Sequence, residues 1–221
     1  MRINTVLQNM SRKLILLNGM TPDGRVFKRL LPYLENYQLI EWVDPEDDQS
    51  IQEYAKRIQR YLGEVRDCDI LGVSFGGIVA QELAPLIGAK KCFIVSSIAD
   101  TKELNGLQRV LASFPRGFHG EFYYTIGKTS EVLAGFGSTN EVFRLKKFVG
   151  EDGAWFRWAT SAVVGWNPQR KEQIHYIRIH GDSDTTFRKG HLYSDHIIEG
   201  ASHVLALTHA KELAELIKQY R

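Results

Sequence analysis

Short apolar runs alternate with amphipathic segments along most of the chain. Several of these runs are almost continuous in Ile, Leu and Val, a pattern typical of strands that are covered on both faces. The predicted strands are Lys13–Leu17, Gln38–Val43, Asp69–Val73, Lys91–Ser97, Ile174–Ile179 and His196–Ile198. Such runs indicate a mostly parallel sheet of about six strands.

The segments between the strands repeat their apolar residues at helical spacing. In the last of them, Leu213, Leu216 and Ile217 share one face. The predicted helices are Asp23–Leu34, Gln49–Leu62, Phe75–Ile87 and His209–Tyr220. Strand and helix in alternation form βαβ units, whose right-handed crossovers produce an α/β, doubly wound sheet with helices on both faces.

Residues 101–166 interrupt this alternation. No strong strand run occurs there, glycines separate short helical stretches, and the segment holds half of the chain's aromatic residues. We interpret it as a helical cap inserted into a single domain that spans residues 1–221. Its aromatic residues, with Trp155 and Trp158 as the first candidates for substrate binding, either line an apolar pocket or form a small core of their own.

The pentad Gly72-Val73-Ser74-Phe75-Gly76 connects a predicted strand to a predicted helix. In this setting G-x-S-x-G is a nucleophile elbow: the tight turn exposes the serine hydroxyl, and the positions two before and two after it need to be almost free of side chain. The start of the following helix directs amide dipoles toward a developing oxyanion. Ser74 is therefore the candidate nucleophile.

A serine nucleophile requires a base and an acid. His203 follows the last predicted strand among small residues and is the best placed of the seven histidines to act as the base. Catalytic groups gather at the carboxyl ends of parallel strands, where Asp182 and Asp184 follow the strand Ile174–Ile179 and Asp100 follows the strand Lys91–Ser97.

The order Ser, Asp, His along the chain is similar to that of the α/β-hydrolase superfamily, whose motif His-Gly-x-x-Asp carries the acid. The match over His180–Asp184 assigns the acid to Asp184, with Asp182 and Asp100 as alternatives. The resemblance also implies an oxyanion hole formed by the backbone amides of Met20 and Phe75. Two positions depart from the family pattern: Asn18 stands where histidine is usual, and Phe187 where a proline commonly follows the acid.

The resemblance implies a small serine hydrolase that cleaves a carboxylester or thioester through an acyl-enzyme. The fold also hosts C–C bond hydrolases and lyases that use the same residues, and a binding protein without catalysis is a further alternative. No cofactor is implied, because the glycines around Ser74 match neither phosphate-binding loop motif. A metal site formed by His180, Asp182 and Asp184 with His191 and His196 is a weaker alternative, and we expect no metal.

Charge and cysteine content indicate which partners and which cellular compartment to expect. The 28 basic and 26 acidic residues leave a formal net charge of +2 without a long basic run, so nucleic acid is not an expected partner. Cys68 and Cys92 lie in or beside apolar runs, as free buried thiols do in a reducing compartment. The run Leu14–Leu17 is too short for a signal peptide or a membrane span. We expect a cytoplasmic enzyme without membrane insertion, acting on a small-molecule ester or thioester.

Overall fold

The strands form one parallel sheet. The computed structural model describes residues 12–20, 24–46, 48–104, 154–187 and 192–221. The strands are β1 (Lys13–Leu17), β2 (Tyr37–Ile40), β3 (Cys68–Val73), β4 (Lys91–Val95), β5 (His175–Gly181) and β6 (His196–Ile198). Their order is β2-β1-β3-β4-β5-β6, and every neighbouring pair is parallel. The predicted sheet is confirmed.

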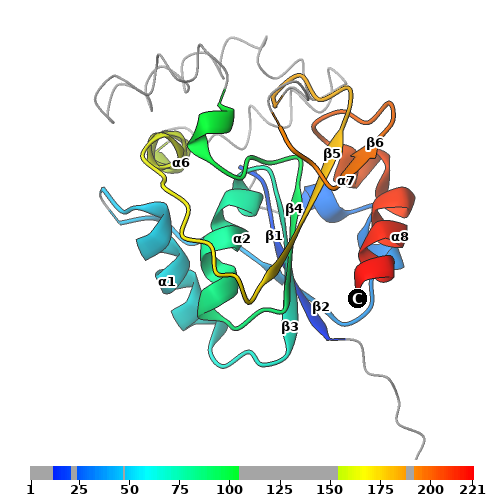
Figure 1. Cartoon of the computed structure of the whole chain (residues 1–221). Helices are drawn as coiled ribbons and strands as arrows, with labels where there is room; N and C mark the ends of the chain where they lie inside the picture. The colour runs from blue at the N-terminus through cyan, green and yellow to red at the C-terminus, as the bar shows by residue number, and fades with distance from the viewer. Residues whose placement is uncertain (1–11, 21–23, 47, 105–153, 188–191) are drawn as a thin grey trace, which may run out of the picture.

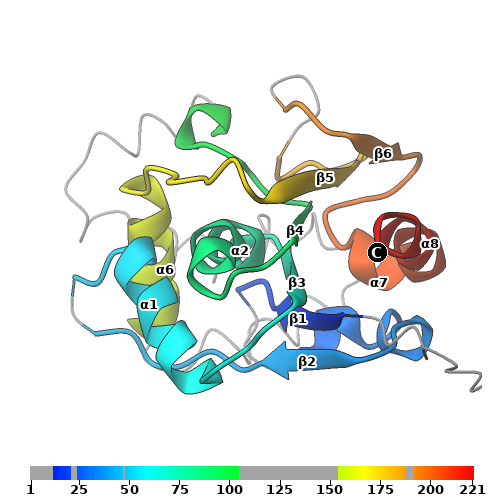
Figure 2. The ribbon, with the colours of Figure 1, turned by 60° about the horizontal axis from the view of Figure 1, so that its bottom comes forward.

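Helices cover both faces of this sheet (Figures 1 and 2). One face carries α1 (Ile51–Leu62), α2 (Phe75–Leu86) and α6 (Ala154–Val164), and the other carries α7 (Leu205–Thr208) and α8 (Ala210–Tyr220). A hydrophobic core lies on each face of the sheet. Each strand contributes side chains to both cores, because successive side chains of a strand point to opposite faces. In β1, Ile15 and Leu17 face the core beneath α1 and α2, whereas Leu14 and Leu16 face the core beneath α8. The sheet is therefore doubly wound, as predicted.

The helix predicted over residues 23–34 is wrong. Two 3-10 turns, η1 (Arg25–Phe27) and η2 (Leu31–Tyr33), occupy the part of this segment that the structure describes. Gly24 has a left-handed φ of 65°. Pro32 lies in the first turn of η2, where its ring would clash with the carbonyl of Lys28 in a continuous α-helix.

The predicted cap lies mostly outside the described residues, because 105–153 are not among them. At its edges the structure describes η3 (Thr101–Glu103) and α6. α6 packs beside α1 and α2 (Figure 2). The limits and the covering role of a cap over residues 101–166 remain a prediction.

Both cysteines are free and buried. Burial raises the pKa of the Cys68 thiol to about 11 and that of Cys92 still further. Both thiols are therefore neutral at physiological pH and poor nucleophiles. Within the described ranges, no helix combines the length and apolar character needed to cross a bilayer.

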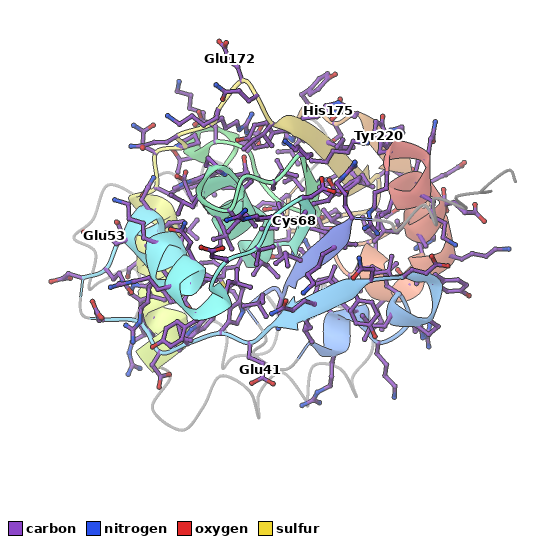
Figure 3. All side chains as sticks on the ribbon, turned by 90° about the horizontal axis from the view of Figure 1, so that it is seen from below. Glu41, Glu53, Cys68, Glu172, His175 and Tyr220 are labelled. Atoms are coloured by element: carbon purple, nitrogen blue, oxygen red, sulfur yellow. The ribbon has the colours of Figure 1, made fainter. Side chains whose placement is uncertain are left out.

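A buried carboxylate closes the amino-terminal edge of the sheet. Figure 3 looks onto this edge, with Cys68 labelled at the start of β3 and Tyr220 near the end of α8. Asp69, which follows Cys68 and is fully buried, lies 3.1 Å from Arg12 Nε and 3.2 Å from Arg221 Nε. Arg221 also donates to the carbonyl of Arg12. The Asp69 side chain thus connects β3 with the segment before β1 and with the residue after α8.

We expect Asp69→Asn to destabilise the fold without a direct effect on the site at the opposite edge. Removing one member of a buried ion pair leaves the other charges uncompensated and costs about 3 kcal/mol in unfolding free energy. Chemical denaturation measures this difference. The control is Asp67→Asn, two residues earlier at an exposed position, which should change stability by less than about 0.5 kcal/mol. Equal effects of the two substitutions would show that the Asp69 ion pairs contribute nothing.

Candidate active site

Ser74 lies in a strained turn between β3 and α2, at the carboxyl edge of the sheet (Figure 1). Its φ of 53° and ψ of −119° are unusual for a residue with a side chain. A Cβ on Gly72 would stand 2.0 Å from the carbonyl oxygen of Gly76, and one on Gly76 would stand 2.1 Å from that of Asn18. Both glycines are therefore required sterically, and the turn has the geometry of a nucleophile elbow.

Three side chains from separate loops meet at this turn. His203 Nε2 lies 3.0 Å from Ser74 Oγ, and His203 Nδ1 lies 2.9 Å from Asp184 Oδ2. Asp184 and His203 are only 3% and 2% exposed, while Ser74 is partly accessible. Residues far apart in sequence thus form one hydrogen-bonded chain that ends at an accessible hydroxyl.

The charge of Asp184 sets the tautomer of His203. Burial alone would raise the pKa of the Asp184 carboxyl, but hydrogen bonds from His180 and His203 outweigh it and hold this pKa well below its ordinary value. An ionised carboxylate only accepts hydrogen bonds, so the proton of neutral His203 resides on Nδ1. Its Nε2 lone pair is then available to accept the proton of Ser74.

Three residues that the sequence does not mark as part of the site hold the Asp184 carboxylate in place. His180 Nε2 lies 3.1 Å from both Asp184 Oδ2 and the carbonyl oxygen of Phe187, so it donates to both acceptors. The amides of Thr186 and Phe187 donate to Asp184 Oδ1 at 2.8 and 2.9 Å. The Phe187 ring also packs edge-on against His203, with centroids 5.4 Å apart. A proline at position 187 would lack the donated N–H.

The alternative carboxylates have other partners. Asp182 Oδ1 accepts hydrogen bonds from the amide of Gly200 at 2.8 Å and from Ser183 Oγ at 3.0 Å. Asp100 caps η3 through the amide of Lys102 at 2.8 Å. His191, a member of the alternative metal cluster, lies outside the described residues. Among those that are described, no group of three or more His, Cys, Asp or Glu side chains is arranged to hold a metal ion.

The two backbone amides predicted for the oxyanion hole belong to adjacent segments. Phe75 is the first residue of α2, so its N–H has no acceptor within the helix. Met20 follows β1, and a Cβ on the preceding Gly19 would lie 3.6 Å from Ser74 Cβ. β1 and β3 are the strands at which the chain reverses its direction across the sheet. In open α/β sheets such a switch point is the usual place for a ligand.

Aromatic side chains surround Phe75. Trp155 and Trp158 of α6 both pack edge-on against its ring, with centroids 5.4 and 5.9 Å away. Trp158 is also held by Tyr54, at 4.4 Å between centroids, and donates its indole N–H to the Gln49 carbonyl at 2.8 Å. These contacts favour a packing role for Trp158. Trp155 also packs against Trp42, with centroids 6.0 Å apart, but no hydrogen bond of its indole is among those described, and it stays a candidate for substrate contact.

Known structures share this architecture. ClbQ from the colibactin NRPS/PKS pathway superimposes with a TM-score of 0.68 at 17% identity, over 95% of this chain and 96% of its own. A lipase-esterase related protein from Clostridium acetobutylicum gives 0.67 at 15% identity, over 96% of each chain. A thioesterase domain from the curacin biosynthetic pathway gives 0.59 at 15% identity, over 94% and 91%.

Comparison with protein-family models and with curated proteins gives no match. The likeness is therefore one of fold, at low identity but over nearly the whole length of both chains. It agrees with the parallel strand order, the helices on both faces and the strained turn after β3. On these grounds the chain has the fold of the α/β-hydrolase superfamily.

Proposed function

We propose that this protein is a serine hydrolase that cleaves a carboxylester or thioester through an acyl-enzyme on Ser74. The observation that carries the proposal is the continuous chain from Ser74 Oγ through His203 to Asp184, with links of 3.0 and 2.9 Å. Nucleophile and base lie within hydrogen-bond reach, and a third group orients the base. A protein that only bound a ligand would have no use for this arrangement.

The mechanism follows from these positions. Ser74 Oγ attacks the carbonyl carbon while its proton passes to His203 Nε2, and the electron pair of the C=O bond moves onto the oxygen. The amides of Phe75 and Met20 stabilise the oxyanion, and the carboxylate of Asp184 stabilises the imidazolium. The oxyanion pair then re-forms the C=O bond while the carbon–oxygen or carbon–sulfur bond to the leaving group breaks, and His203 protonates that leaving group, which leaves the acyl-enzyme. A water molecule then attacks the acyl-enzyme in the same way, with His203 as the base, and Ser74 leaves with its proton restored. No cofactor takes part.

The choice of an ester or thioester rests on the fold neighbours. They include a lipase-esterase related protein and a thioesterase domain, and an acyl-enzyme on a serine accounts for the hydrolysis of either bond. A fluorophosphonate probe followed by a panel of oxygen esters and thioesters of increasing acyl length tests the proposal. Absence of both labelling and turnover in the folded protein would contradict it.

We expect the aromatic residues of α6 to influence acyl-length preference. Trp155→Ala should change discrimination between acetyl, butyryl and octanoyl esters by about 1 to 3 kcal/mol, because it alters an apolar subsite beside Phe75. Trp158→Ala should change it less, since Tyr54 and Gln49 hold that partly buried side chain against the core. Relative kcat/KM across the ester series measures both effects. Unchanged ratios in both variants would remove these residues from the substrate site.

A further inference from the structure

Trp42 lies where the first two strands of the sheet end together. Leu17, the last residue of β1, pairs with Ile40, the last residue of β2. The residues two positions further on, Gly19 and Trp42, therefore leave the sheet side by side. Trp42 Nε1 donates a hydrogen bond of 2.7 Å to the carbonyl oxygen of Gly19.

This hydrogen bond determines the direction of a neighbouring amide. The carbonyl of Gly19 and the N–H of Met20 belong to one planar peptide unit, in which they point in opposite directions. Holding the oxygen toward Trp42 therefore holds the Met20 N–H away from it. The same bond polarises the peptide and makes its N–H a stronger donor.

The Trp42 ring also contacts the second half of the predicted oxyanion hole. It packs edge-on against Phe75, with centroids 5.4 Å apart and an interplanar angle of 71°. Tyr54 and Trp155 each lie 6.0 Å from it, centroid to centroid. Tyr54 also donates its hydroxyl to the carbonyl of Val43, next in the chain after Trp42, at 2.7 Å. These contacts restrict the Trp42 ring to one orientation.

We propose that Trp42 is a positioning residue for the oxyanion hole: it orients the Gly19–Met20 peptide by a hydrogen bond and supports Phe75 by ring packing. The inference rests on the proposed acyl transfer at Ser74. In this proposal the indole N–H of Trp42, which is not part of the triad, pre-organises the Met20 N–H, and that N–H stabilises the developing charge. Pre-organised donors of this kind act in the transition state more than in substrate binding.

Trp42→Phe removes the indole N–H and keeps an aromatic ring. We expect kcat to fall by about 10- to 100-fold, less than for complete loss of an oxyanion donor, with KM little changed. Affinity for a trifluoromethyl ketone, which forms a tetrahedral adduct with the serine, should fall in the same proportion as kcat/KM. A second variant carries 3-benzothienylalanine at position 42. It replaces only the N–H by sulfur, so it keeps the ring volume if Trp42→Phe does not fold.

The matched control is Trp166→Phe. Trp166 is 2% exposed and donates its indole N–H to Glu82 at 2.7 Å, far along α2 from Ser74. This variant loses the same atoms and one buried hydrogen bond, so it should lose stability while keeping kcat and analogue affinity.

An active wild type whose Trp42 variants keep full kcat, or lose no more than Trp166→Phe does, would overturn the role of Trp42 and leave the proposed function standing. A wild type that neither turns over the panel nor reacts with the fluorophosphonate would overturn both.

Discussion

Ser74→Ala is expected to abolish fluorophosphonate labelling and to lower ester or thioester turnover by about 10⁴- to 10⁶-fold. The loss is this large because no other group can replace the attacking oxygen. Ser74 Oγ is the hydroxyl that lies 3.0 Å from His203 Nε2. The fold should persist, since alanine only removes one oxygen from a residue whose backbone geometry is held by the glycines around it.

Labelling by the probe and steady-state kinetics measure this effect, with circular dichroism and thermal unfolding as checks on the fold. Ser50→Ala is the control. Ser50 caps α1 through the amide of Glu53 at 3.2 Å, so its loss should cost about 1 kcal/mol of stability and no activity. Labelling that survived in Ser74→Ala would place the nucleophile at another residue.

Asp184→Asn is expected to lower kcat by about 10⁴-fold. The amide side chain can present an N–H to His203 Nδ1, which favours the tautomer that carries its proton on Nε2. In that tautomer the ring nitrogen that faces Ser74 has no free lone pair, so it cannot accept the serine proton. Asp184 is the carboxylate found 2.9 Å from His203 Nδ1.

Asp182→Asn and Asp100→Asn are the matched controls, because each makes the same chemical change in a loop carboxylate with other partners. Both should keep kcat within a few-fold of the wild type. A larger loss in either control than in Asp184→Asn would reassign the acid.

The difference in stability between wild type and Asp184→Asn should depend on pH. The pKa of Asp184 is lower in the folded protein than its ordinary value, so its ionised form stabilises the fold above the unfolded-state pKa of about 4. This contribution is lost as the pH falls through the folded-state pKa. The stability difference between wild type and Asp184→Asn should therefore be full at neutral pH and shrink in strong acid.

Features that depend on neighbouring residues were predictable from the sequence. The predicted strands lie within a few residues of the observed ones, because strands buried on both faces consist of continuous apolar runs. Gly72, Ser74 and Gly76 were identified together, because one tight turn imposes their spacing. The helix over 23–34 was predicted wrongly: its apolar spacing was helical, but Gly24 and Pro32 outweighed the periodicity.

Features that depend on pairing between distant segments were not predictable. The apolar run Gln38–Val43 predicts a strand that includes Trp42, whereas β2 ends at Ile40. The contact of Trp42 with Gly19 depends on the register between β1 and β2. Asp182 and Asp184 are alike in sequence. In the structure the amide of Gly200 donates a hydrogen bond to Asp182, whereas His203 contacts Asp184.

Local patterns in the chain predict the fold class, the strained serine turn and the small set of residues from which a base and an acid are drawn. These follow from side-chain periodicity and from local steric limits, which act over a few neighbouring positions. Packing between distant segments places Asp184 rather than Asp182 against His203, brings His180 and Phe187 to that carboxylate, and directs the indole N–H of Trp42, which follows β2, to the carbonyl of Gly19. Hydrogen bonds of about 3 Å between loops depend on sheet register and packing, which residues far apart in the chain set jointly.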